Sequence, residues 1–366
     1  MFENIIGQDR ALRILRNAIT SEKISQAYIF YGPEGVGKFL TALSFAKVLN
    51  CLSNKEPSCK CTSCVKITNF VHPDVRLFFP IPNFDLNEYG FVKLKENQEK
   101  DPSKNADFVS YNKYIENKMK TPWEDYRFTD KACSIRIEQI RALQKDIMMS
   151  KYEGKKKVYI LENFDSLTHN ASNAFLKTLE EPPPDTHFIL IVRNIEKLLP
   201  TILSRCLKIE FFSIRTAIIE DFLINNMYLD KEKANLYARI SNGSLEKSFS
   251  LFYNGNLEII DISTSFIRIV DEKDDTAFLE WMDKYFPKGA KNTDLFRSFV
   301  LYLYVWIRDK SVSAISDRHI DGETPSVQPN YIKTLLSLNE YLEKHAGNVN
   351  PKLLLSQIYI NLCSIQ

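Results

Sequence analysis

The stretch best suited to chemistry is residues 32–39, which read GPEGVGKF. Gly32, Gly35, Gly37 and Lys38 fit the pattern G-x-x-x-x-G-K of a phosphate-binding loop. Glycines let the backbone N–H groups turn toward phosphate oxygens, and the lysine reaches the β- and γ-phosphates. An apolar run precedes the loop and a helical pattern follows it, which is the context that this motif requires. The sequence therefore predicts a loop shaped to hold nucleotide phosphates.

Two positions that would support ATP hydrolysis carry unsuitable side chains. The residue after the lysine normally offers a hydroxyl to Mg²⁺, and here it is Phe39. A second apolar run, VYIL, is followed by Glu162 at the position of the metal-binding aspartate and by Asn163 at the position of the base. An amide cannot take a proton from water at neutral pH. Because two separate parts of the machinery are missing together, we expect inefficient hydrolysis or none.

Four of the seven cysteines crowd into one short segment, with the spacing C-x7-C-x-C-x2-C. Four thiolates suit a closed, tetrahedral zinc site of the structural kind. The pair with a single intervening residue is tighter than usual, and four free thiols in a surface loop are the alternative. In a reducing compartment such crowding favours metal over disulfides. The predicted zinc ligands are Cys51, Cys59, Cys61 and Cys64.

The elements that must position these residues follow from the spacing of apolar side chains. Short apolar runs bounded by turns predict strands, and apolar residues at three- and four-residue intervals predict helices. The alternation of the two indicates an α/β domain with a mainly parallel sheet. The predicted strands cover 27–31, 158–161, 187–192 and 207–212, and the predicted helices cover 9–20, 40–50, 137–147 and 170–180.

Two segments differ from this alternation. Residues 82–132 are polar and rich in Asn, Lys and Glu, which predicts an insertion that is partly helical around 110–120 and as a whole forms a solvated surface excursion. From about residue 212 the pattern is helical almost throughout. We expect an α/β core over 1–211, a small helical domain over 212–258 and a larger helical domain over 259–366.

The composition narrows the function classes. The 366 residues carry a net charge of +2, so no overall basic field favours nucleic acid. No apolar run reaches the ~18 residues that a membrane crossing needs, and the first residues lack the pattern of a signal peptide. These features predict a cytoplasmic protein without a membrane partner.

Several motifs together resemble the AAA+ clamp-loader subunits of bacterial DNA polymerase III, the delta-prime and gamma/tau families. They occur in the family's order: IIGQDRALRILRNAI, AYIFYGPEGVGK, the four-cysteine loop, HPDV, IEQIRAL, NAFLKTLEEPP and LLPTILSRC. The resemblance covers residues 1 to about 211 well and the helical remainder less. It implies an AAA+ core, a helical lid and a helical collar that mediates oligomerisation.

The resemblance also implies a role for the Ser-Arg-Cys motif, Ser204, Arg205 and Cys206. In this family the arginine reaches the ATP of an adjacent subunit, where a guanidinium neutralises charge on the γ-phosphate. An ordinary surface ion pair is the alternative. The implied partners are gamma/tau and delta subunits in a hetero-pentamer, the sliding clamp, and primer–template DNA through the assembly.

Departures from the family pattern favour the delta-prime family. The first sensor position falls near Val192 and Arg193, and the second sensor arginine aligns with Glu246. The resemblance thus implies a polymerase-complex subunit that helps load the clamp, donates Arg205 to a neighbour's ATP and does not hydrolyse ATP itself. Whether the loop holds ATP, ADP or neither stays open. The alternatives are a gamma/tau-like ATPase and a zinc-dependent nucleic-acid-binding module.

Overall fold

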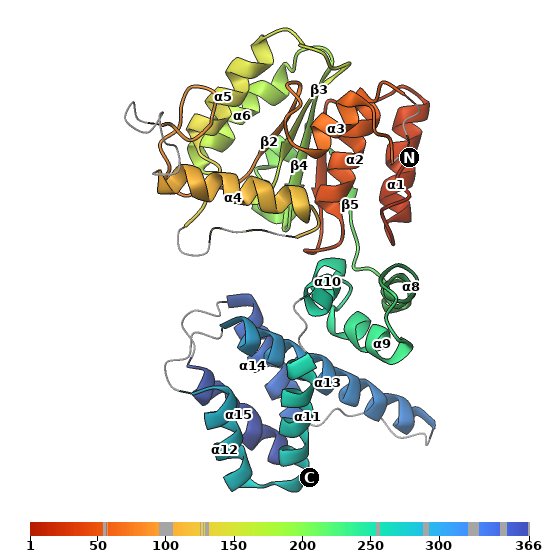
Figure 1. Cartoon of the computed structure of the whole chain (residues 1–366), viewed down its shortest axis with the longest axis vertical. Coiled ribbons are helices and arrows are strands. Elements are labelled where there is room, and N and C mark those ends of the chain that lie inside the picture. The colour runs from red at the N-terminus through yellow and green to blue at the C-terminus, as the bar shows by residue number, and fades with distance from the viewer. Residues whose placement is uncertain are drawn as a thin grey trace. The chain divides into compact units, whose positions relative to one another are not determined.

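The chain folds into two compact units (Figure 1). One comprises Met1–Met227 with Gly243–Lys247, and the other comprises Tyr228–Asn242 with Ser248–Gln366. The domain boundaries at residues 211 and 258 stay predictions. This computed structural model describes residues 1–53, 56, 58–94, 105–124, 126, 128, 132–253, 257–287, 293–320, 329–344 and 350–364.

The first unit is built on a five-stranded sheet in which every neighbouring pair is parallel. Its order is β2-β3-β4-β1-β5. The predicted parallel sheet is confirmed. One edge strand, β2, was not predicted, because four residues are too few to show a periodic pattern. The strands are β1 (Ala27–Tyr31), β2 (Val75–Phe78), β3 (Lys157–Leu161), β4 (Thr186–Val192) and β5 (Leu207–Glu210).

Helices cover both faces of this sheet (Figure 1). Alternate residues of β1 explain why: Tyr28 and Phe30 pack in one core with α1 and α2, while Ala27 and Ile29 pack in another with α5 and α6. A buried parallel sheet needs such cover on both sides. The helices are α1 (Asp9–Thr20), α2 (Lys38–Asn50), α5 (Ile137–Met148) and α6 (His169–Glu180), with α3 (Thr62–Thr68) beside α2.

The predicted insertion contains α4 (Ala106–Lys120), so its helix is confirmed. The interpretation as a solvated surface excursion is wrong for this helix. Tyr114 stacks on Phe79, with ring centroids 4.0 Å apart, inside a small aromatic core just beyond β2. Parts of the segment, 95–104 among them, lie outside the described residues.

The elements described after β5 are all helices, as expected. The second unit buries Phe266, Trp281, Phe299 and Leu303 in its own core. Among the described residues, no helix has the length and apolar character needed to cross a membrane. After η3 (Phe164–Ser166), η4 (Ile195–Lys197) and α7 (Pro200–Leu203) come α8 (Thr216–Met227), α9 (Lys231–Ile240), α10 (Leu245–Tyr253), α11 (Leu257–Glu272), α12 (Asp275–Tyr285), α13 (Thr293–Ile320), α14 (Pro329–Lys344) and α15 (Pro351–Cys363).

Candidate functional site

The predicted phosphate loop connects β1 to α2 at the carboxyl end of the sheet. Its three glycines all have positive φ: 135° at Gly32, 69° at Gly35 and 93° at Gly37, the residue before α2. A Cβ on Gly32 would lie 2.1 Å from the carbonyl oxygen of Phe211. Only glycine suits such a backbone at so close an approach. The motif therefore has the backbone that its spacing predicts.

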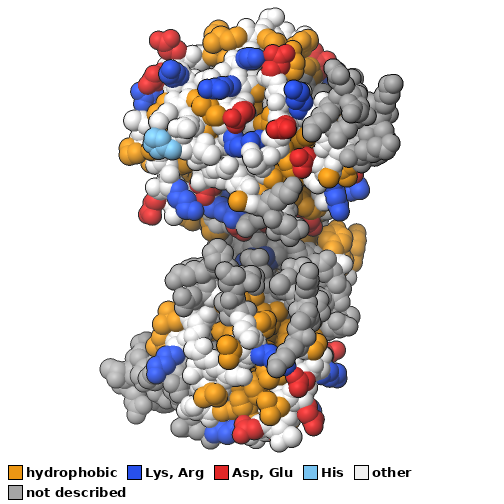
Figure 2. All heavy atoms as spheres, turned by 90° about the vertical axis from the view of Figure 1, so that its left-hand side faces the viewer, with side chains coloured by type: hydrophobic (Ala, Val, Ile, Leu, Met, Phe, Trp, Pro, Cys, Tyr) orange, Lys and Arg blue, Asp and Glu red, His pale blue; other side chains and the backbone are white. Residues whose placement is uncertain are grey.

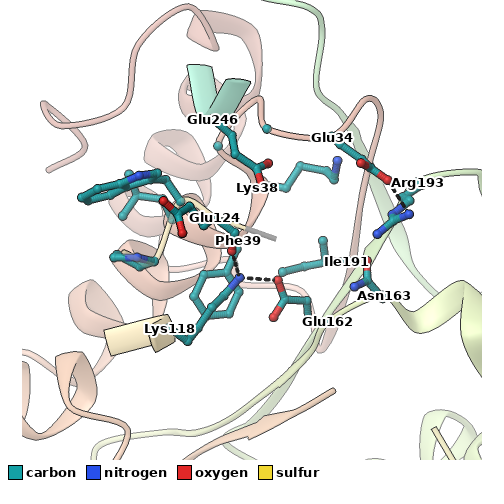
Figure 3. Close-up of a pocket in the computed structure, with 15 residues that line it drawn as sticks. Glu34, Lys38, Phe39, Lys118, Glu124, Glu162, Asn163, Ile191, Arg193 and Glu246 are labelled. Atoms are coloured by element: carbon teal, nitrogen blue, oxygen red, sulfur yellow. Dashed lines mark hydrogen bonds and ion pairs between the residues drawn. The ribbon is translucent and has the colours of Figure 1, made fainter. Parts of the chain in front are cut away.

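A pocket at this loop gathers the residues that the sequence singled out (Figure 3). Its volume is about 50 Å³, whereas small-molecule sites usually offer roughly 300–1,000 Å³. With its side chains as they lie here, the pocket is smaller than a nucleoside triphosphate. The polar lining includes Glu34, Lys38, Lys118, Glu162, Asn163, Arg193 and Glu246, and Phe39 adds an aromatic ring.

The loop lysine turns back onto the loop. Lys38 Nζ donates a hydrogen bond of 2.7 Å to the Gly32 carbonyl oxygen and another to that of Pro33. The Thr41 hydroxyl donates to the Gly37 carbonyl oxygen at 2.8 Å, so it does not replace the hydroxyl missing at Phe39. The ammonium group thus engages backbone oxygens in the place where a phosphate would be held.

Two contacts bring further charged side chains to the pocket. The backbone N–H groups of Leu245 and Glu246 donate to the Gly35 carbonyl oxygen at 2.9 and 3.3 Å. Glu246, which the resemblance aligns with the second sensor, therefore brings a carboxylate to the phosphate loop (Figure 3). Arg193, beyond the end of β4, forms an ion pair with Glu34 of the loop. A carboxylate beside phosphates repels them, so Glu246 disfavours bound ATP.

The acidic residue after β3 has a partner that sequence reasoning missed. Glu162 is buried, and its Oε1 lies 2.7 Å from Lys118 Nζ of α4. Tyr114 donates to Glu162 Oε2 at 3.2 Å. A signal was present: Tyr111, Tyr114 and Lys118 follow one another at helical spacing, which puts a lysine on the apolar face of the predicted helix.

The Ser-Arg-Cys motif lies between α7 and β5, and its arginine is exposed. Arg205 donates to the Thr201 carbonyl oxygen at 2.9 Å and forms an ion pair of 3.1 Å with Glu180 at the end of α6. Ser204 is exposed, whereas burial raises the pKa of the Cys206 thiol to about 12. The surface ion pair considered as the alternative therefore exists in the isolated chain.

Sheet topology separates Arg205 from the chain's own phosphate loop. In the parallel pair β1–β5, Tyr28 lies opposite Leu207 and Tyr31 lies opposite Glu210. Arg205 precedes β5, while the loop follows β1. Three strand residues alone span roughly 10 Å, so the arginine and the loop lie at opposite ends of the sheet. Arg205 therefore does not contact the chain's own phosphate loop.

The four cysteines predicted as zinc ligands come together. Their Sγ atoms all lie within 4.8 Å of one another, and Cys51 Sγ is 3.5 Å from Cys59 Sγ. Four sulfurs at the Zn–S distance of ~2.3 Å in a tetrahedron are ~3.8 Å apart. Burial opposes ionisation of Cys61, but hydrogen bonds from the Cys64 and Leu52 backbones prevail and lower its pKa to about 6. The donor set fits a structural zinc ion.

Comparison with known proteins decides the family. The family model described as DNA polymerase III, delta subunit, matches residues 7–215. The chain belongs to this family. Membership, the phosphate loop and the five-stranded parallel sheet identify an α/β AAA+ core with helical additions.

The relatives of this chain include a delta-prime subunit and a tau subunit, which belong to the two groups named in the resemblance. The chain is 31% identical over 240 residues to DNA polymerase III subunit delta' of Bacillus subtilis, covering 65% of this chain and 57% of that protein. It is 29% identical over 270 residues to the tau subunit of the same organism, covering 72% and 38%. The match thus spans less than two thirds of either relative's own length.

One solved structure aligns with most of the chain. It is the gamma subunit-related protein of Thermotoga maritima, with 16% sequence identity and a TM-score of 0.47, and the match covers 96% of this chain and 98% of that one.

Proposed function

We propose that this chain is a nonhydrolytic clamp-loader subunit of the DNA polymerase III holoenzyme. In this role it assembles with gamma/tau and delta subunits into a hetero-pentamer. It helps that assembly load the sliding clamp onto primed DNA and presents Arg205 to the ATP of a neighbouring subunit. Zinc held by Cys51, Cys59, Cys61 and Cys64 stabilises the loop after α2.

The observation that carries the proposal is the contrast between a phosphate pocket narrowed by the chain's own side chains and an exposed arginine. Phe39 supplies no metal ligand, and Glu162 is bound to Lys118. Arg205 faces solvent at the other end of the sheet, where it can reach a different molecule. A subunit that supports hydrolysis without performing it needs this combination.

A gamma/tau-like ATPase is the second candidate, since tau subunits of Bacillus subtilis and Escherichia coli are 29% and 28% identical to the chain. The small pocket and the carboxylate of Glu246 argue against it. Steady-state ATP turnover by the isolated chain, abolished by Lys38→Ala, would support it instead.

A zinc-dependent nucleic-acid-binding module is less well supported. On the face of the first unit shown in Figure 2, acidic and basic side chains are interspersed. Backbone-directed DNA binding requires a basic patch or stripe. DNA binding by the isolated chain that falls with salt and is lost on chelation would favour this candidate.

The test of the proposal is ATP turnover by the reconstituted complex with Arg205→Ala. DNA-stimulated ATPase should fall while this chain still folds and assembles. Arg141→Ala, which changes an exposed arginine on α5, is the matched control. Undiminished ATPase with the Arg205 variant would refute the role of Arg205.

A further inference from the structure

The helix of the insertion places a cation inside the phosphate pocket (Figure 3). Lys118 Nζ lies 2.7 Å from Glu162 Oε1, 2.7 Å from the Glu124 carbonyl oxygen and 4.2 Å from the centroid of the Phe39 ring. Its side chain is only 1% exposed. Two oxygen acceptors and one aromatic face match the three N–H donors of an ammonium group.

This cation lies beside the two positions that bind Mg²⁺ in phosphate-loop nucleotidases. There the metal lies between the hydroxyl residue that follows the loop lysine and the acidic residue that follows the second strand. Phe39 and Glu162 occupy these two positions, and Lys118 contacts both. Phe39 cannot bind a metal, but its ring can receive an ammonium group.

We propose that α4 is an internal occupant of the nucleotide site, with the Lys118 ammonium group as a built-in replacement for Mg²⁺. The proposal deepens the nonhydrolytic role, on which it rests, because it states what keeps this site closed. The lack of a hydroxyl at Phe39 removes one metal ligand, whereas Lys118 occupies the space in which the metal would bind. A divalent cation entering here would face a fixed positive charge.

The rest of α4 is built to hold Lys118 in place. Tyr114 lies one turn earlier, stacks between Phe79 and Phe128, and donates to the second carboxylate oxygen of Glu162. The Asn105 side chain caps the helix by accepting from the N–H groups of Asp107 and Phe108. Glu162 is thus bound by two side chains of one helix, so admitting Mg²⁺ requires the Lys118 side chain to leave its position.

The experiment distinguishes a site that lacks only a metal ligand from a site that Lys118 occupies. Mant-ATP binding to the purified full chain is measured with and without MgCl₂ for the wild type, Phe39→Thr, and Phe39→Thr with Lys118→Met. Phe39→Thr combined with Lys113→Met is the matched control, because Lys113 is an exposed lysine of the same helix.

We expect Phe39→Thr alone and the control to bind as the wild type does. Phe39→Thr with Lys118→Met should bind at least tenfold more tightly, and only with Mg²⁺. Equal binding by Phe39→Thr alone and by this double variant would overturn the proposal. So would a double variant that has native circular dichroism but binds no better than the wild type.

A measurement on the wild type keeps the proposal testable if the double variant does not fold. Acylation of lysines by an N-hydroxysuccinimide ester, followed by peptide mass spectrometry, should modify Lys118 at least tenfold more slowly than Lys113. Equal rates would show that Lys118 is not held in the pocket, which refutes the proposal. Neither experiment involves Arg205, so a clamp-loader ATPase that is insensitive to Arg205→Ala would refute the proposed function separately.

Discussion

The two ends of the sheet each carry a cation paired with a carboxylate, and the pairs differ in burial. Lys118 and Glu162 are 1% and 6% exposed, whereas Arg205 and Glu180 are 36% and 52% exposed. Lys118 and Glu162 contact each other instead of water. Separating them costs free energy, because each would then be a buried charge without a partner. The second pair is hydrated and can exchange its partner.

This difference shows how one AAA+ core can separate two tasks. A buried pair fixes the chain's own site, while an exposed pair leaves a guanidinium ready for a phosphate that offers more charge than one carboxylate. Under the proposed function, Glu180 holds Arg205 only until a neighbour's ATP arrives.

The largest expected effect tests the exposed end. Arg205→Ala should lower ATP turnover at the adjacent subunit's site by ~10³-fold or more, the usual effect of losing an arginine finger. The chain's own free energy of unfolding should change by less than ~1 kcal/mol. Rapid-quench ATPase of the complex and urea denaturation of the chain measure the two. A large stability loss would show that the arginine is structural and would break the comparison.

The next effect tests the buried end. Lys118→Met should lower the free energy of unfolding by ~3–5 kcal/mol, because it leaves Glu162 buried without its charge partner. Lys113→Met should change it by less than ~0.5 kcal/mol. Urea denaturation gives both values. Equal, small losses of stability for the two variants would mean that the buried pair stabilises the fold no more than the exposed pair does.

A second substitution, at Glu162, tests whether the loss of stability comes from the unpaired buried charge. Lys118→Met combined with Glu162→Met should regain most of the lost stability, since removing both charges avoids the penalty of either alone. A double variant as unstable as Lys118→Met would locate the loss in packing around α4 instead of in charge burial.

Zinc removal should not disturb the buried pair of Lys118 and Glu162. The cysteine loop follows the carboxyl end of α2 and the phosphate loop precedes its amino end, about 20 Å apart for a helix of this length. Chelation should cost ~2.7 kcal/mol relative to free zinc at 100 times its dissociation constant. Metal analysis should give one zinc per chain, and Cys61→Ser should reduce it. A chain without bound zinc at neutral pH would contradict the metal site.

The smallest expected effect tests whether Glu180 only positions Arg205 or is itself required for ATP hydrolysis. Glu180→Gln should change stability by at most ~1 kcal/mol, because the pair is exposed. It should change the complex's ATPase less than threefold. Loss of ATPase as severe as that of Arg205→Ala would mean that Glu180 takes part beyond positioning.

Much of the core was predictable from local pattern. The helix after Lys38 and the strand before Glu162 each have a signature a few residues long, and both were confirmed. The phosphate-loop geometry and the four-sulfur cluster agree with the spacing that predicted them. Strand β2 was missed because four residues carry no period, and the role of α4 was missed because nothing local marks its partner.

By itself the sequence determined the phosphate loop, the missing hydroxyl at Phe39, the cysteine spacing and the Ser-Arg-Cys motif, because each depends on neighbours along the chain. Only the tertiary structure decided that Lys118 meets Glu162, 44 residues away, and that Arg205 and the phosphate loop lie at opposite ends of the sheet. Contacts between distant residues depend on strand order and on how an insertion packs across the sheet, and no short segment specifies either.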